Sequence, residues 1–306
     1  MTVTAHQPPQ LARANGIDIC YEIFGDPAAE PLLLIMGLGA QMIIWDDAFC
    51  EQLAARGFRV IRFDNRDIGQ SSKMHGGKRI TPLELIKLRF FQVPVAASYR
   101  LIDMARDTMG LMDALHIRAA HLVGASMGGM IAQEAALAFP HRLLSLTSIM
   151  SNTGNLRLPS PRREVATILR APPPRTKQAY IDRFIRTWKV LRVGSFPDDE
   201  ALDPARAERT FARGLNPAGV DRQLRAILAS GSRKPRLHAV TAPTLVIHGS
   251  VDPLVHPVAG RETAAAIPGA KLLMIEGMGH ALPIRMWPQL IDAIATHAHG
   301  ASAKAA

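Results

Sequence analysis

Strand-like and helical segments alternate along most of this chain, and this alternation constrains its fold more than any other feature of the sequence. Strand patterns occupy residues 17–23, 32–36, 58–63, 119–123, 144–150, 243–248 and 271–275, and helical patterns occupy 46–56, 101–115, 258–266 and 287–298. The segment 32–36 is apolar throughout, as in a strand buried on both faces. Regular alternation predicts an α/β fold, in which a mostly parallel sheet is flanked by helices.

The alternation is interrupted once, by residues 151–236, where arginine-rich helical patterns and proline-rich breaks such as 171–175 replace the short apolar strands. We interpret this segment as a helical insertion, or cap. The core domain then comprises residues 1–150 and 237–300. The alanine-rich tail 301–306 is expected to be disordered, since chain ends fray unless they are anchored.

Composition narrows the class of protein further. With 306 residues, of which 48% are hydrophobic and 20% charged, the chain can bury a large core and is neither disordered nor collagen-like. The apolar stretch 31–36 is far shorter than the roughly 20 residues that span a bilayer, and residues 1–10 do not resemble a secretory signal. We therefore expect a cytoplasmic protein. Cys20 and Cys50 lack metal-site spacing, so we expect buried free thiols and no metal site.

The net charge of +10 is concentrated in the insertion. Residues 156–236 contain 18 Lys and Arg against 8 Asp and Glu, which accounts for the whole excess. A solvated helical surface is the favoured interpretation, while attraction of an anionic substrate and contact with nucleic acid are the alternatives. Nucleic acid is disfavoured because the aromatic side chains of this segment are sparse and lie at helical spacing.

A single G-x-S-x-G motif, residues 124–128, joins one strand pattern to the helical pattern that follows it. In this context the motif predicts a nucleophile elbow, a sharp strand-to-helix turn that exposes Ser126. Glycine is needed at Gly124 and Gly128 because a side chain at either position would collide with the neighbouring elements. The start of a helix also favours negative charge developing at Ser126.

A serine nucleophile needs a histidine base that is oriented by a carboxylate. Where the serine lies on such an elbow, the acid and then the histidine follow it in the chain, each after a strand. Asp252 and His280 each follow a strand pattern in this order. The alternative acid position, residues 151–153, contains no carboxylate. The sequence therefore predicts a catalytic triad of Ser126, Asp252 and His280.

Acyl transfer also needs hydrogen-bond donors for the oxyanion of the tetrahedral intermediate. The backbone N–H of Met127, directly after the nucleophile, is one predicted donor. The other is the N–H of Leu38, in the loop that follows the strand pattern 32–36. Gly37 and Gly39 keep this loop thin enough to present its backbone.

Two further polar groups invite a functional interpretation. Asp64, Arg66 and Asp67 follow a strand and could form a second acid site, but a hydrogen-bonded turn is the favoured interpretation. His248 ends its strand and is interpreted as a positioning residue rather than a base.

The chain from residue 31 to 300 resembles the α/β-hydrolase superfamily. Within it, Met36-Gly-Leu-Gly39, Trp45 and the segment 63–71, Phe-Asp-Asn-Arg-Asp-Ile-Gly-Gln-Ser, look like the subgroup that contains aclacinomycin methylesterase. The resemblance implies an eight-stranded core, a mobile helical cap between the sixth and seventh strands, the same triad and no cofactor. Met36 stands where a histidine is common in the wider superfamily, which makes the floor of the pocket more apolar.

We therefore expect a serine hydrolase that cleaves a carboxylic ester or lactone of a small to medium apolar substrate. Met36, Gly37, Trp45, Phe184 and Trp188 are the candidate substrate-binding residues of an apolar pocket. Hydrolysis of a carbon–carbon bond by the same triad, and ligand binding without turnover, are the alternatives. The expected partner is a small-molecule ester, with neither nucleic acid nor membrane involved, and the formation of a homodimer is left open.

Overall fold

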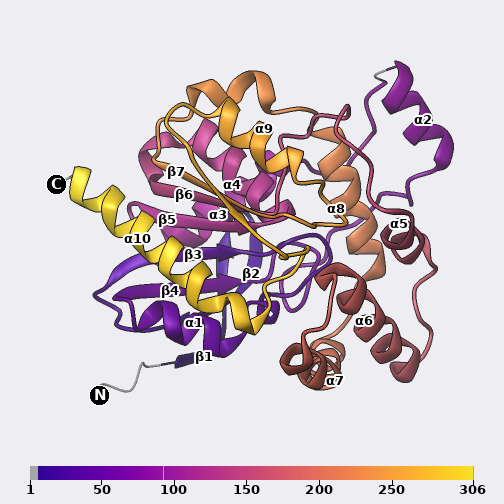
Figure 1. The fold of residues 1–306 in the computed structure, drawn as a ribbon, viewed down its shortest axis with the longest axis horizontal. Helices are drawn as coiled ribbons and strands as arrows, with labels where there is room; N and C mark the ends of the chain where they lie inside the picture. The colour runs from indigo at the N-terminus through magenta and orange to yellow at the C-terminus, as the bar shows by residue number, and fades with distance from the viewer. Residues whose placement is uncertain (1–5, 92, 306) are drawn as a thin grey trace.

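An eight-stranded sheet forms the centre of the computed structural model, which describes residues 6–91 and 93–305 (Figure 1). Its strands are β1 (His6–Ala14), β2 (Ile17–Phe24), β3 (Glu30–Ile35), β4 (Phe58–Phe63), β5 (Ala120–Ala125), β6 (Leu143–Ile149), β7 (Thr244–Gly249) and β8 (Lys271–Ile275). Their order across the sheet is β1-β2-β4-β3-β5-β6-β7-β8. The β1–β2 and β2–β4 pairs are antiparallel, and every other pair is parallel. The predicted mostly parallel sheet is confirmed.

Helices cover both faces of this sheet (Figure 1). The α-helices are α1 (Asp47–Ala54), α2 (Pro82–Phe91), α3 (Leu101–Ala114), α4 (Met127–Ala138), α5 (Arg163–Arg170), α6 (Lys177–Arg192), α7 (Pro197–Ala212), α8 (Pro217–Ala229), α9 (Val258–Ala266) and α10 (Trp287–Ala305). Short 3-10 helices span Met42–Ile44, Pro140–Arg142, Lys234–Ala239 and Ile284–Met286. α1 and α10 pack on one face, and α3, α4 and α9 pack on the other.

The position of β3 in the sheet explains the apolar run of residues 32–35 within it. Successive side chains of a strand point to opposite faces of the sheet. Leu32 and Leu34 join the core beneath α1 and α10, whereas Leu33 and Ile35 join the core beneath α3 and α4. All four are fully buried, as the sequence predicts for this segment.

The two ends of the chain differ from the sequence-based expectation. No strand is predicted before residue 17, but β1 forms the edge of the sheet, where prolines are tolerated because an edge strand need not donate every N–H. The expectation of a disordered tail is wrong for residues 301–305, which continue α10. Ala301 is buried, and the Ser302 hydroxyl donates a hydrogen bond to Glu30 at 2.7 Å, so this turn is anchored to the core. Ala306 lies outside the described residues.

Helices α5 to α8 lie between β6 and β7, within the segment interpreted as a cap. Phe184 and Ile181 of α6 pack with Ala207 of α7 in a small apolar cluster of their own. In Figure 1 these helices stand to one side of the sheet, next to the ends of its strands. The cap therefore covers the core at the ends of the strands and not at an edge strand.

Most of the basic side chains of the cap that the structure describes are exposed, as a solvated surface requires, but several of them pair with carboxylates of the core. Arg222 is buried and forms an ion pair with Asp67 at 2.6 Å. Arg213 pairs with Asp64 at 2.5 Å, and Arg236 pairs with Glu134 at 2.7 Å. Each pair joins the cap segment to the core, so much of the positive excess neutralises core carboxylates.

The charged turn after β4 is hydrogen-bonded, in agreement with its interpretation as structural. Asp64 accepts hydrogen bonds from the backbone N–H groups of Met42 and Gln70. The guanidinium of Arg66 donates two hydrogen bonds, each of 2.6 Å, to the carboxylate of Asp107, and both residues are buried. These side chains fix the turn to its neighbours and leave no acid free in it.

Both cysteines are buried free thiols, as predicted. Burial raises the pKa of Cys20 to about 11 and the pKa of Cys50 to about 12, so both remain protonated at neutral pH. Among the described residues, none of the helices combines the length and the apolar character that crossing a membrane requires.

Candidate active site

Ser126 occupies the sharp turn between β5 and α4, with φ 55° and ψ −119°. This is a strained conformation for a residue with a side chain, and it is maintained by close packing around it. A Cβ on Gly124 would lie 2.2 Å from the carbonyl oxygen of Gly128, and a Cβ on Gly128 would lie 2.0 Å from that of Ile35. The two glycines of the motif are therefore required by the close approach of backbones, as the sequence analysis expects.

The loops after β7 and β8 bring Asp252 and His280 together. The Nδ1 atom of His280 lies 2.7 Å from Oδ2 of Asp252, and both side chains are almost fully buried. The other carboxylate oxygen accepts hydrogen bonds from the N–H groups of Leu254 and Val255, both at 2.8 Å. Asp252 is thus fixed by its own loop and orients the imidazole of His280.

The electrostatics of this pair favour a charged carboxylate. Burial acts to raise the pKa of Asp252, but the charge and the hydrogen bond of His280 outweigh it and hold the pKa below its usual value. An ionised Asp252 stabilises the protonated form of His280, which is the state that a base reaches after it accepts a proton.

His248 lies directly behind the acid. Its Nε2 atom is 2.8 Å from the carbonyl oxygen of Val255 and 3.5 Å from Oδ2 of Asp252. Burial lowers the pKa of His248, so its neutral form predominates and Nε2–H donates to Val255. A Cβ on Gly260 of α9 would lie 2.7 Å from the His248 ring, so close packing also holds the ring. This arrangement fits a positioning residue that supports the loop of Asp252.

The loop after β3 passes directly over Ser126. A Cβ on Gly37 would lie 3.0 Å from Cβ and 3.5 Å from Oγ of Ser126. The carbonyl oxygen of Met36 accepts a hydrogen bond from the side chain of Asn65 at 2.8 Å, which fixes the start of the loop. The loop that contains Leu38 therefore faces the serine across a very short gap, as an oxyanion-binding loop must.

Hydrogen bonds also join the same loop to the cap. Gln223 of α8 accepts a hydrogen bond from the N–H of Gly39 at 2.9 Å. Gln41 donates from its side chain to the carbonyl oxygens of Thr210 and Gly214, both at 2.9 Å. Gln223 and Gln41 are both buried, so these bonds are shielded from water.

The cap also contacts the loop of His280. The backbone N–H of His280 donates to the carbonyl oxygen of Leu191, at the end of α6, at 2.7 Å. A Cβ on Gly279 would lie 2.2 Å from this oxygen, so glycine is required for the approach. Hydrogen bonds consequently join the cap to two of the loops that would carry catalytic groups, at Gly39 and at His280.

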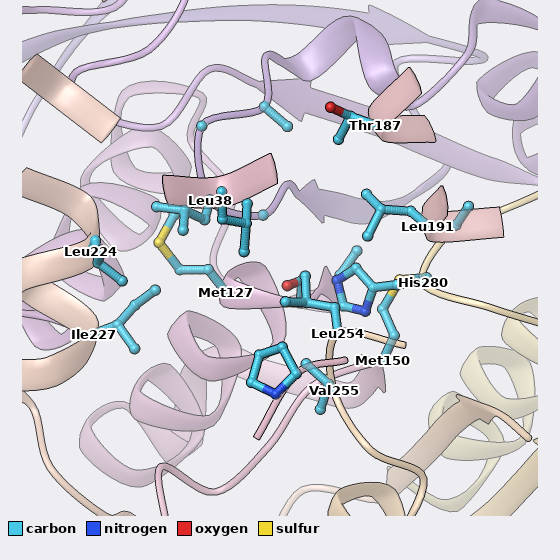
Figure 2. A pocket seen from close by; sticks show the side chains of 18 of the residues that line it. Leu38, Met127, Met150, Thr187, Leu191, Leu224, Ile227, Leu254, Val255 and His280 are labelled. Atoms are coloured by element: carbon cyan, nitrogen blue, oxygen red, sulfur yellow. The ribbon is translucent and has the colours of Figure 1, made fainter. Parts of the chain in front are cut away.

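A cavity of about 1280 Å³ lies between the core and the cap. Ser126 and His280 line it, and Figure 2 shows His280 near Leu191 with Leu38 and Met127 on the same pocket. Most of the labelled side chains around it are apolar, including Leu224 and Ile227 of α8 (Figure 2). The site can therefore hold a large apolar molecule beside the serine.

All the predicted site residues gather at this place. The cavity is lined by Met36, Gly37, Leu38, Trp45, Ser126, Met127, Phe184, Trp188 and His280, and Asp252 lies behind His280. Sequence reasoning missed Gln223 and Leu191, which contact the two loops. Neither has a motif around it, because a glutamine in a helix and a backbone carbonyl at a helix end carry no local signal.

Comparison with known proteins identifies the family to which this fold belongs. A family model described as the alpha/beta hydrolase fold matches residues 30–284. The chain belongs to the α/β-hydrolase family, and the predictions of this fold and of an α/β-hydrolase enzyme are confirmed.

Within that family the chain is similar to two methylesterases over nearly its whole length. The rhodomycin D methylesterase DauP of Streptomyces sp. (strain C5) is 31% identical over 96% of this chain and 99% of its own length. The rhodomycin D methylesterase DnrP of Streptomyces peucetius is 32% identical over the same shares. The predicted resemblance to the methylesterase subgroup is thereby confirmed.

Solved structures share the architecture at lower identity. The meta-cleavage product hydrolase CumD of Pseudomonas fluorescens IP01 matches with a TM-score of 0.73 at 19% identity, covering 95% of this chain and 98% of its own. The enol-lactonase of Burkholderia xenovorans LB400 also matches with a TM-score of 0.73, at 22% identity, covering 94% and 99%. At such identities the likeness shows the fold alone.

Proposed function

We propose that the protein hydrolyses a carboxylic ester, and specifically a methyl ester of a bulky apolar carboxylic acid. The observation that carries this proposal is the 2.7 Å hydrogen bond between Asp252 and His280 at a cavity that the strained Ser126 also lines. The two methylesterase relatives support the ester class and the small alcohol.

The first half of the reaction is acylation. The Oγ atom of Ser126 attacks the ester carbonyl carbon while the Nε2 atom of His280 accepts its proton, and Asp252 stabilises the imidazolium through Nδ1. The N–H groups of Leu38 and Met127 hold the oxyanion, a contribution of about 10²–10³ in rate for each donor. The C–O bond to the alcohol then breaks, and His280 returns the proton to the departing methanol.

Deacylation repeats these steps with a water molecule as the nucleophile. His280 accepts a proton from a water molecule, whose oxygen attacks the acyl-enzyme, and the carboxylic acid leaves as Ser126 recovers its proton. Only the small alcohol has to be exchanged for water between the two halves. The bulky acyl group stays in the cavity throughout.

Cavity size supports a bulky acyl group. Small-molecule sites commonly measure about 300–1,000 Å³, whereas this cavity is about 1280 Å³. Trp45, Phe184 and Trp188 give it broad apolar walls that suit fused rings. The proposed substrate is therefore larger than the small to medium size that the sequence analysis expects.

The experiment compares methyl esters of carboxylic acids from acetic acid to a three-ring aromatic acid, together with p-nitrophenyl esters of increasing acyl length. Wild type is expected to turn over the large esters with the highest kcat/KM, and Ser126→Ala is expected to lose turnover while still binding them. Ser151→Ala is the matched control, because Ser151 is a buried serine after the neighbouring strand and does not line the cavity.

Two outcomes would contradict the proposal. Turnover that survives in Ser126→Ala would exclude the serine mechanism. A folded wild type that hydrolyses no ester would exclude the ester class, and a dienone acid would then test the carbon–carbon alternative. Saturable binding without any product would favour the binding-protein alternative.

A further inference from the structure

Helix α2 exposes an unusual amount of apolar surface. Of the thirteen large apolar side chains exposed among the described residues, six lie within residues 83–93. These six form what we call the α2 patch: Leu83, Leu85, Ile86, Phe90, Phe91 and Val93. Phe90 and Phe91 are 73% and 72% exposed, and α2 stands away from the sheet (Figure 1). Clustered exposed apolar residues of this kind mark an interaction surface.

The α2 patch adjoins the active-site cavity through Leu85, which belongs to both. Leu85 and Arg89 of α2 line the cavity, as do Leu169 of α5 and Leu156 before it. Leu156 and Leu169 are also exposed, so α2 and the segment that leads into α5 both place exposed apolar side chains at this cavity. Whatever covers the α2 patch therefore lies next to the cavity that Ser126 lines.

Positive charge accompanies the patch. Lys87 and Arg89 are exposed on α2, and Lys78 is exposed shortly before it. The one acidic residue of the helix, Glu84, is paired with Arg225 of α8 at 3.0 Å. Hydrogen bonds from Thr81, together with Arg225, lower the pKa of Glu84 to about 2. The surface presented outward therefore combines aromatic and basic side chains.

Arg225 also forms hydrogen bonds with the chain on both sides of α2. Its guanidinium donates to the carbonyl oxygens of Lys78 and Arg79 before α2 and of Ala96 after it. Arg225 is itself buried. These hydrogen bonds of Arg225 fix the orientation of α2, in which Leu88 is buried and the α2 patch is exposed. The exposure of these apolar residues is therefore a property of the fold.

The positive charge beside the α2 patch favours an anionic bilayer over a second copy of the chain as its partner. A second copy docking by a two-fold axis would bring the same basic side chains of both copies together, in a protein whose net charge is already +10. An anionic bilayer instead offers phosphates to Lys87 and Lys78 and an apolar interior to Phe90 and Phe91. Aromatic and basic residues on one short helix are the combination that binds such interfaces.

We propose that the α2 patch docks on the anionic surface of a lipid bilayer, which places the cavity next to the lipid. An apolar ester dissolved in the bilayer then reaches Ser126 without crossing water. This docking is peripheral, and it differs from the expectation of no membrane partner, because the sequence does not reveal which apolar residues are left exposed.

The test is co-sedimentation with vesicles of phosphatidylcholine alone or of phosphatidylcholine mixed with phosphatidylglycerol. Wild type is expected to bind the mixed vesicles, and binding should weaken in high salt. Phe90→Ser/Phe91→Ser and Lys78→Glu/Lys87→Glu should each lower binding about 10-fold. Leu11→Ser is the matched control, since Leu11 is an exposed apolar residue on β1, and it should bind like wild type.

The readout is independent of the proposed function, because binding is measured without turnover. Phe90 and Phe91 do not line the cavity, so their double variant should keep wild-type turnover of a soluble ester and show that the protein is folded. Wild type that fails to bind mixed vesicles, or a phenylalanine variant that binds equally well, would overturn the proposal. Sedimentation velocity showing a wild-type dimer and a monomeric variant, without vesicle binding, would assign the patch to a second copy instead.

Discussion

Gln223 of the cap and Gly39 of the core are joined by a hydrogen bond of 2.9 Å, in which the glycine N–H donates. The side-chain amide of Gln223 also donates to the carbonyl oxygen of Arg66 at 2.9 Å, so the glutamine is fixed at both ends. Because the Gly39 N–H is occupied, the peptide that follows Leu38 has a defined orientation. A residue of the cap thus helps to set the geometry of the proposed oxyanion hole.

Replacing Gln223 should therefore affect rate more than binding. In Gln223→Met the acceptor for Gly39 is lost, and we expect kcat to fall about 10- to 100-fold, because a displaced oxyanion donor acts mainly in the transition state. Gln223→Glu keeps an acceptor oxygen and should retain more of kcat. Steady-state kinetics on one ester would measure both. Equal kcat values in the two variants, or a change confined to KM, would contradict this role.

Asp252 should be needed for the tautomer of His280 rather than for folding. In Asp252→Asn the acceptor of the Nδ1 proton becomes an amide, and kcat should fall about 10³–10⁴-fold. The double variant with Ser126→Ala should be no worse than Ser126→Ala alone, since the residues act as a unit. Single-turnover kinetics and circular dichroism check the two parts. An effect that adds fully to that of Ser126→Ala would show that Asp252 acts elsewhere.

Gly279 and Gly277 offer a matched pair in the loop of His280. A Cβ on Gly279 would lie 2.2 Å from the Leu191 carbonyl oxygen, so Gly279→Ala should push α6 away from the loop and lower both stability and kcat. Gly277 has φ 72° but open space around it. Gly277→Ala should cost only about 1 kcal/mol of stability, from backbone strain, and leave kcat nearly unchanged. Thermal unfolding and kinetics of both variants would show whether contact with the cap, rather than loop strain, controls His280.

The parts of the structure that depend on contiguous residues could be predicted from sequence. The elbow at Ser126 needs only two glycines and the strand and helix around them, and β3 needs only its run of apolar residues. The order of Asp252 and His280 follows from the alternation of strands and helices. For these features the residues that determine the local structure are neighbours in the chain, so the sequence pattern predicts the structure.

Contacts between distant segments could not be predicted in this way. Gln223 and Gly39 are 184 positions apart, and Ser302 and Glu30 are 272 apart, so neither contact leaves a local pattern. The arginines of the cap show the same limit. Their charge is visible in the sequence, but their carboxylate partners lie in core segments that only the fold brings near. Helix α2 was not predicted because its apolar residues do not face a core and so lack helical periodicity.

The Arg222–Asp67 pair predicts how stability depends on pH. Burial acts to raise the pKa of Asp67, but hydrogen bonds from Arg222, Tyr99 and the Met74 N–H outweigh it, and the pKa falls below its usual 3.8. The folded state therefore binds this proton less readily than the unfolded state does. The stabilisation is complete above the unfolded pKa and is lost as the pH falls through the lower, folded value.

Asp67→Asn tests this relationship directly. The variant leaves the buried guanidinium of Arg222 without a carboxylate, so at pH 7 we expect a loss of about 3–5 kcal/mol in the free energy of unfolding. Because the titrating group is gone, the difference from wild type should shrink as the pH is lowered below about 4. Asp113→Asn is the control, since Asp113 forms an exposed ion pair with Arg142, and it should cost no more than about 1 kcal/mol. Urea unfolding at several pH values measures all three proteins, and a difference for Asp67→Asn that stays constant down to low pH would show that its carboxylate does not stabilise the fold through its charge.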